Sequence, residues 1–349
     1  MGIRLIDAPG TGYDPHIGLV GSSGLKPTSL AVVDTSYILD RAARRLRGAA
    51  AVPTVDSFGG IGSIRLFAPM RVANELRWNV RSAAGRLGVP PDALSRVVWT
   101  DFVTRTRFVE LPPPNDLDDD RLKRLFDMDP EDIDLGRLGL NLAPSHVYSH
   151  DKHLRIAGFS LAIEELDAVL AAGLAIEVSD GALVTTGFAM RAGAAGVSGA
   201  VKGISVRLEV PLWVVGLVAA LIVAGGVWWS LSTPERRAKA EELLKRLAVP
   251  ANGMVERRVA GKDLLERTSL QAPVPSVENR IFRALALARG PLLAGEIHAM
   301  LAERSDAPSV GWIRSFLVSH PAFVRVGPHR WQLGRQVVSL REAPTLERR

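Results

Sequence analysis

The fold is decided by the stretch Leu30-Ala31-Val32-Val33-Asp34, which continues directly into Thr35-Ser36-Tyr37-Ile38-Leu39. Four apolar residues closed by an acidic one predict a short buried strand whose carboxyl end presents Asp34. Thr35 or Ser36 then lies near the start of a helix, where a hydroxyl side chain is a favourable cap. A buried strand that runs straight into a helix is typical of an α/β sheet.

Helical and strand-like segments alternate downstream of this strand. The pattern predicts short strands over 108–111 and 147–149 and four helices, over 69–84, 91–101, 121–127 and 132–143. Strands that alternate with helices predict a parallel sheet flanked by helices, so the expected fold class is α/β. Ligands of such sheets gather at the carboxyl ends of the strands.

Acidic side chains recur at the ends of these strands and on the helices that flank them. They are Asp34, Glu75, Asp132, Asp134 and Asp151. Carboxylates from several segments of one sheet can converge on a single point, where they repel one another unless a cation is bound. Hard oxygen ligands favour Mg²⁺ or Mn²⁺. Such ions can generate a hydroxide and stabilise the leaving oxygen in phosphodiester hydrolysis.

Four segments resemble, in order and spacing, the motifs of PIN-domain nucleases. They are AVVDTSYIL (31–39), VANEL (72–76), DPEDIDLGRLGL (129–140) and YSHDKHLRIAGF (148–159). The resemblance covers about residues 28–165. In that family, four acidic residues bind one or two divalent cations and cut RNA, usually single-stranded. The resemblance therefore implies a magnesium- or manganese-dependent ribonuclease.

The resemblance also assigns roles to individual residues. Asp34, Glu75 and Asp151 match three of the four acids of the family. The remaining acid is Asp132 or Asp134, and the small residues that follow, Gly136 and Gly139, favour Asp132. Arg137 stands where the family usually has a small residue, which departs from the expected helix packing. The hydroxyls that resemble the family's supporting groups are Thr35, Ser36 and Ser149.

Other polar residues of this region are given structural roles. The acidic run 115–120 predicts a solvated helix start rather than a metal site. His146, His150 and His153 do not have the spacing of a zinc motif, so we expect them at the surface.

Composition excludes several classes of protein. The 349 residues include no cysteine, so disulfides, thiolate catalysis and Cys-based zinc sites are excluded. With 47% hydrophobic and 23% charged residues, the chain is not mainly disordered. Residues 1–232 carry 23 basic and 25 acidic side chains, whereas 233–349 carry 20 and 12. The basic rear part is suited to an anion such as nucleic acid or anionic lipid.

The uncharged stretch 211–231 is long enough to cross a bilayer, and Trp213, Trp228 and Trp229 lie near its ends. It therefore predicts a membrane helix. The alternative is a helix buried in an apolar core or in a homo-oligomer, which would leave the protein cytoplasmic. Five basic residues follow the span and three precede it, which favours a cytoplasmic location for the C-terminal side. A single pass would then place the nuclease-like part on the opposite side of the membrane, which conflicts with a cytoplasmic nuclease.

The C-terminal part resembles a winged helix. Helices predicted over 276–289, 293–302 and 309–319 are followed by a hairpin around Gly327-Pro328-His329. The stretch resembles winged-helix domains of the RNA polymerase delta subunit and HARE-type proteins. That resemblance implies binding of DNA, RNA or a protein partner. The residues it places toward nucleic acid are Trp312, Arg314, Arg325 and Arg330.

The expected organisation has six parts: an irregular leader (1–27), a PIN-like domain (28–165), an extension and Gly/Ala-rich connector (166–210), a membrane span (211–231), a charged helix and linker (232–276) and a winged helix (277–341). The sequence thus predicts a membrane-tethered, metal-dependent ribonuclease. The alternative is a non-catalytic, membrane-anchored regulator or adaptor that uses both domains for binding.

Overall fold

The computed structural model describes residues 29–48, 64–114, 117–162, 259–272, 275–288, 290–302 and 306–337, with single positions between 165 and 176 and at 256. The predicted leader, most of the connector and the hydrophobic segment 211–231 lie outside these residues and stay predictions. Within the described ranges, no helix is both long enough and apolar enough to cross a membrane.

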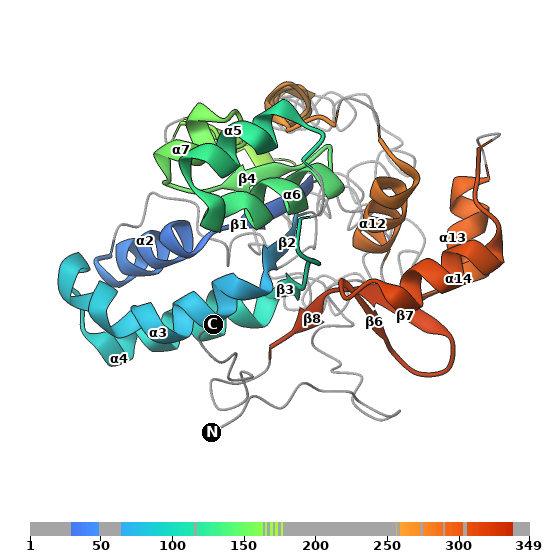
Figure 1. Cartoon of the computed structure of the whole chain (residues 1–349). Coiled ribbons are helices and arrows are strands. Elements are labelled where there is room, and N and C mark those ends of the chain that lie inside the picture. The colour runs from blue at the N-terminus through green and yellow to red at the C-terminus, as the bar shows by residue number, and fades with distance from the viewer. Residues whose placement is uncertain are drawn as a thin grey trace, which may run out of the picture.

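A five-stranded sheet lies at the centre of the molecule, in the order β4-β1-β2-β3-β8 (Figure 1). Its strands are β1 (Ser29–Val33), β2 (Ile64–Pro69), β3 (Thr106–Val109), β4 (His146–Tyr148) and β8 (Arg335–Gln336). The first four are parallel, and β8 pairs antiparallel with β3. The predicted α/β class with a mainly parallel sheet is confirmed.

Helices cover both faces of this sheet (Figure 1). The helices are α2 (Thr35–Leu46), α3 (Met70–Leu87), α4 (Pro91–Val97), α5 (Asp120–Met128), α6 (Ile133–Asn141) and α7 (Lys152–Ile156). The chain runs from β1 outward to β2 and β3, then crosses back to β4 on the other side of β1. Because such crossovers are right-handed, α2 and α3 lie on one face and α6 on the other. Between β1 and β4 the covering helices change face, and sheets of this kind bind ligands at that point.

The sequence did not predict β2, although it is a central strand. Arg65 interrupts its apolar run and Pro69 closes it, so the segment lacks the pattern of a buried strand. The Arg65 guanidinium instead donates to the carbonyls of Ala286 (2.7 Å) and Ala288, at the end of α12 (Val277–Leu287). A cation at a helix C-terminus is favourable, so the Arg65 side chain stabilises the contact between β2 and the end of α12.

The C-terminal residues form three helices and a small antiparallel sheet. The elements are α12, β5 (Leu292–Leu293), α13 (Ala294–Leu301), α14 (Val310–Ser319), β6 (Phe323–Arg325) and β7 (Arg330–Leu333), with strand order β5-β7-β6. The three predicted helices and the hairpin are confirmed. Trp331 is buried beneath the hairpin rather than exposed.

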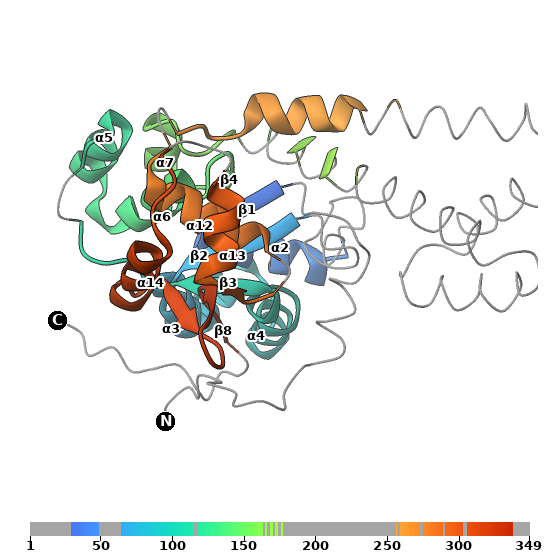
Figure 2. The same ribbon diagram turned by 90° about the vertical axis from the view of Figure 1, so that its right-hand side faces the viewer.

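This C-terminal part is joined to the central sheet. Figure 2 shows α12 close to α6 and β8 at the sheet edge. Arg283 of α12 donates to the carbonyls of Leu142 (3.0 Å) and Pro144 (2.9 Å). The turn between β7 and β8 needs Gly334, whose φ is +68°, and a Cβ there would lie 2.9 Å from the Phe108 carbonyl oxygen. The buried apolar residues of both parts form one continuous cluster.

The described end of the stretch 232–276 is not a linker. Residues 259–268 are helical, and Leu265 and Leu270 are buried. Leu270 also exchanges two backbone hydrogen bonds with Ser145. The sequence predicted a linker because prolines lie nearby, but the apolar residues of this segment are buried against the rest of the protein.

Candidate metal centre

Asp34 lies at the point where β1 ends and α2 begins, as predicted. It is 6% exposed and caps α2. Its Oδ1 accepts from the Thr35 backbone N–H (2.6 Å), and its Oδ2 accepts from the hydroxyls of Ser36 (2.6 Å) and Ser149 (2.8 Å). The Asp34 N–H donates to the Tyr148 carbonyl (3.0 Å), which ties the end of β1 to the end of β4. The carboxylate is therefore fixed in place by both strands.

Glu75 approaches from the second turn of α3. Its Oε2 accepts a 2.5 Å hydrogen bond from the Thr35 hydroxyl. Its Oε1 lies 3.3 Å from the guanidinium of Arg71, one turn earlier on the helix. Thr35 thus joins two acids of the cluster, because its N–H binds Asp34 and its hydroxyl binds Glu75.

Asp132 and Asp134 differ in what they face. Asp132, just before α6, accepts a 2.5 Å hydrogen bond from Arg71 and lies within the electrostatic reach of Asp34 and Asp151. Asp134 instead pairs with Arg137 (3.0 Å). Arg137 also donates to the Pro112 carbonyl (2.7 Å), so its side chain leaves α6 away from the sheet. The departure at Arg137 does not disturb the packing of α6.

Gly139 allows α6 to approach the sheet closely. A Cβ at this position would lie 2.8 Å from a Val147 methyl group and 2.9 Å from one of Leu270. The small residues of this motif therefore position the helix that brings Asp132 to the cluster.

Asp151 follows β4 and caps α7, where its Oδ1 accepts from the His153 N–H (2.5 Å). The His153 ring Nδ1 lies 3.5 Å from Asp151 and 3.4 Å from Asp129. Possible ligand atoms of Asp129, Asp151 and His153 all lie within 4.8 Å of one another. A nitrogen ligand favours transition metals over Mg²⁺.

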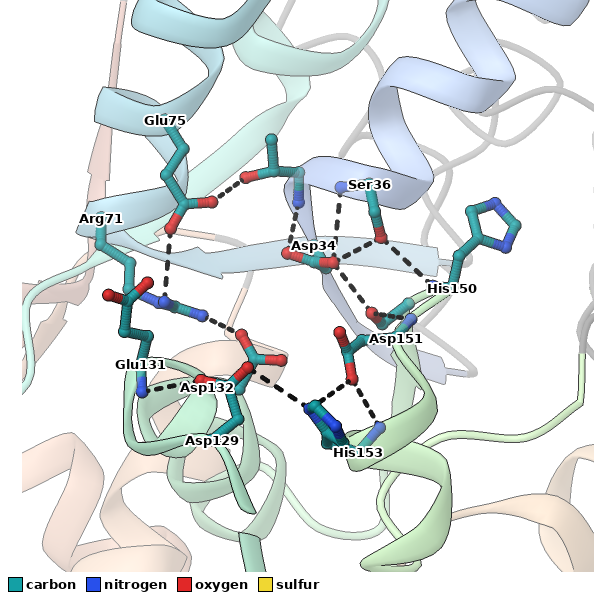
Figure 3. Close-up of polar contacts among 12 residues, drawn as sticks. Asp34, Ser36, Arg71, Glu75, Asp129, Glu131, Asp132, His150, Asp151 and His153 are labelled. Atoms are coloured by element: carbon teal, nitrogen blue, oxygen red, sulfur yellow. Dashed lines mark hydrogen bonds and ion pairs between the residues drawn. The ribbon is translucent and has the colours of Figure 1, made fainter. Parts of the chain in front are cut away.

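Figure 3 shows Asp34, Asp132 and Asp151 turned toward one another, with Arg71 and Glu75 at one end and His153 and Asp129 at the other. Burial, together with the charges of Asp34 and Asp151, raises the pKa of Asp132 to about 6, although Arg71 opposes the shift. Burial, with Asp34 and Glu131 nearby, also raises the pKa of Glu75. The cluster therefore carries more negative charge than Arg71 offsets.

Three neighbours of the site were missed from the sequence: Arg71, Asp129 and His153. Arg71 precedes Glu75 by four residues on a predicted helix, a spacing that indicates an ion pair. His153 was expected at the surface, but its side chain is partly buried beside Asp151. His146 contradicts that expectation outright. It is buried in β4 between the hydroxyls of Ser29 (3.2 Å) and Thr268 (3.1 Å).

The residues predicted to contact nucleic acid in the C-terminal part lie in different settings. Arg314 and Arg325 are exposed. Trp312 is 41% exposed and stacks on Phe316, with ring centroids 5.3 Å apart. Arg330 donates to the Pro291 carbonyl (2.9 Å), so it holds the hairpin to the segment before α13.

Four of the five predicted acids, Asp34, Glu75, Asp132 and Asp151, thus lie in one region, whereas Asp134 pairs with Arg137 outside it. Among the described residues, the group whose possible ligand atoms come within 4.8 Å of one another is Asp129, Asp151 and His153. The acidic run before α5 does not join the four acids, and Asp119 caps that helix. Comparisons of the chain with family models, with curated proteins and with solved structures found no match.

Proposed function

We propose that the chain is a metal-dependent ribonuclease of PIN type, which hydrolyses RNA phosphodiesters with Mg²⁺ or Mn²⁺. The observation that carries the proposal is the convergence of Asp34, Glu75, Asp132 and Asp151 from four separate segments at the carboxyl ends of β1 and β4. A structural cap explains Asp34 or Asp151 singly. It does not explain why Asp132 and Glu75 approach them.

The donor set fits a divalent cation. Asp34 Oδ1 accepts one hydrogen bond and so has a second lone pair for a metal, and Arg71 contacts Oδ1 of Asp132, which leaves its Oδ2 for a metal. Burial is the main cause of the raised pKa of Asp132, with smaller contributions from the charges of Asp34 and Asp151, and a bound cation would favour the ionised carboxylate. When bound, such a cation supplies an activated water and stabilises charge on the phosphate.

The protein's own groups organise this centre. Ser36 and Ser149 hold the Asp34 carboxylate in one orientation, and Thr35 holds Glu75 beside it. Arg71 offsets part of the negative charge while remaining within reach of a phosphate near Asp132. These contacts place the charged groups before a substrate arrives, which is the main requirement for phosphoryl chemistry.

A non-catalytic binding role is the second candidate, and Arg71 favours it. The guanidinium bridges Glu75 and Asp132, so part of the cluster is neutralised without any metal. In that case the acids and Arg71 would form a structural ion-pair network. Metal-dependent cleavage distinguishes the two functions.

We propose that the C-terminal part is a winged helix that binds nucleic acid or a protein partner through Arg314 and Arg325. Three helices followed by a hairpin support this assignment. The proposed membrane tether at 211–231 would hold the ribonuclease at a membrane.

The test uses the full chain, because β8 and α12 complete the sheet and its packing. Purified protein is incubated with single-stranded RNA in Mn²⁺, in Mg²⁺ and in EDTA. We expect cleavage with either cation and none in EDTA. Thermal unfolding provides a second measurement: Mn²⁺ should raise the Tm of the parent, and Asp132→Asn should abolish that rise. If Mn²⁺ neither stabilises the chain nor supports cleavage, the binding role is correct instead.

A further inference from the structure

The exposed face of α3 extends away from the metal centre. Five residues follow one another on it at spacings of four, three, four and four: Arg71, Glu75, Trp78, Ser82 and Arg86. Positions three or four apart lie on one face of a helix. Six apolar residues of α3 occupy the opposite face and are buried. A continuous strip therefore leads from the acids along the helix surface.

Trp78 is the most exposed aromatic side chain among the described residues, at 65%. The guanidinium of Arg77 lies over its ring, 5.4 Å from the centroid. Single exposed apolar side chains are common on protein surfaces, but this ring lies close to Glu75 and has a cation beside it, which is the combination found where a base stacks.

The neighbours of Trp78 indicate which kind of ligand this ring suits. Asn79, Ser82 and Gly85 are exposed next to it, and none adds apolar surface. Residues that dominate a protein–protein interface are surrounded by other contacts that exclude water, whereas the residues around Trp78 are polar or small and exposed. Base stacking needs only an aromatic face and nearby cations.

The charge of this flank matches a polyanion. Residues 35–48 and 70–105, which include α2, α3 and α4, carry ten arginines against four acidic side chains. Arg41 is buried and three of the other arginines pair with acids of this flank, so the remaining six supply its net positive charge. On α3 itself, Arg81 and Arg86 are exposed beyond Trp78. Arginines along a surface supply phosphate contacts that do not depend on sequence.

We propose that this face of α3 binds the substrate strand, with Trp78 stacked on an unpaired base and Arg81 and Arg86 near its phosphates. The inference rests on the proposed ribonuclease function, since Glu75 lies about 4.5 Å from Trp78 along the helix axis. A strand held here presents its adjacent phosphate to the metal centre.

The geometry points to a single strand rather than a duplex. Bases inside a duplex already stack on one another, so none is available to an exposed tryptophan without being flipped out. Single-stranded binding proteins combine a basic surface with aromatic rings, and both are present on α3.

The test measures RNA binding by the full chain in EDTA, where no cleavage occurs. The probe is a labelled single-stranded RNA of about 15 nucleotides, followed by fluorescence anisotropy, alone and annealed to its complement. Trp78→Ala should weaken single-strand binding about 5- to 100-fold, and Trp78→Tyr should restore most of it. Phe126→Ala is the matched control, because Phe126 is an exposed aromatic (41%) on α5.

The outcomes separate this inference from the proposed function. If Trp78→Ala binds RNA as tightly as the parent while Asp132→Asn abolishes cleavage, the α3 surface is not the binding track and the ribonuclease proposal stands. If binding depends on Trp78 but no metal supports cleavage, the binding track stands and the catalytic proposal fails. Equal losses for Trp78→Ala and Phe126→Ala would also overturn the inference, because stacking at one ring would not explain them.

Discussion

The two flanks of the metal centre differ in charge. The flank that contains α2, α3 and α4 carries ten arginines and four acidic residues, whereas residues 117–162, with α5, α6 and α7, carry six basic and nine acidic ones. Both flanks supply carboxylates to the same cluster. An acidic site repels RNA, so a polyanionic substrate can approach only if cations hold its backbone on one side. If the chain has the proposed function, this contrast predicts that RNA enters over α3.

The two flanks also differ in how their cations are used. On the acidic flank, Arg121 pairs with Asp119 (2.7 Å), Lys123 with Asp120 (3.0 Å) and Arg137 with Asp134 (3.0 Å). Three of its six basic residues are therefore neutralised locally, and its nine acidic residues leave the flank with a net negative charge. On the basic flank, arginines outnumber the acids, so a net positive charge remains for a partner.

The largest expected effect separates two acids of the acidic flank that lie two residues apart. Asp132→Asn should reduce RNA cleavage at least about 100-fold, because it removes a charge from the metal centre. Asp134→Asn should reduce it less than about threefold, because Asp134 pairs with Arg137 outside the cluster. The measurement is the initial cleavage rate at saturating Mn²⁺. Asp132→Asn is the cleaner variant, since Asp34 and Asp151 also cap helices. Equal losses for both variants would contradict this geometry.

Charge reversal on each flank tests the contrast directly. Arg81→Glu on α3 should weaken single-stranded RNA binding about tenfold and reduce the salt dependence of the binding constant. Arg124→Glu on α5 is the matched control, since both arginines are exposed on helices, and it should change affinity less than about twofold. Anisotropy titrations at several salt concentrations in EDTA provide both values. Similar effects on the two flanks would show that RNA does not distinguish them.

Arg71 lies where the two flanks meet. Its substitution should lower the free energy of unfolding while leaving the fold unchanged. Arg71→Gln leaves Glu75 and Asp132 without their cation, which should lower the free energy of unfolding in EDTA by about 1–2 kcal/mol. Mn²⁺ should then stabilise the variant more than the parent, because the metal replaces the lost charge. Arg44→Gln is the control, since it breaks a comparable pair with Asp40 (2.8 Å) away from the cluster. A smaller Mn²⁺ effect in Arg71→Gln than in the parent would contradict this role.

Much of the sheet and of the acid set could be predicted from local sequence. The run Leu30–Val33 closed by Asp34 has the pattern of a buried strand, and the structure places β1 there. The helices α3, α6 and α14 follow from apolar spacing and turn residues. These features depend on neighbours within a few residues, which a sequence displays directly.

The features that could not be predicted depend on contacts between distant segments. β2 contains Arg65, which makes sense in a strand only because its guanidinium reaches the end of α12. β8 is two residues long and exists because it pairs with β3. The sequence favoured Asp132 over Asp134 from Gly136 and Gly139, but it could not show that Asp132 contacts Arg71 while Asp134 pairs with Arg137.

The last expected effect is the pH dependence of the metal-free chain, which reports on how closely the carboxylates of the two flanks lie. The pKa of Asp132 is raised from 3.8 to about 6 by burial and by Asp34 and Asp151. Between about pH 4 and pH 6 the folded chain therefore holds a proton that the unfolded chain has released, so acidification through this window stabilises the folded state.

Urea unfolding in EDTA should show this as a difference between the parent and Asp132→Asn. The free energy of unfolding of the parent should rise relative to the variant as the pH falls from 7 to 4. Saturating Mn²⁺ should remove this rise of the parent relative to the variant on acidification, because a bound cation keeps Asp132 ionised and lowers its pKa. If the difference between parent and variant is flat in EDTA, the acids of the two flanks do not interact as closely as Figure 3 shows them.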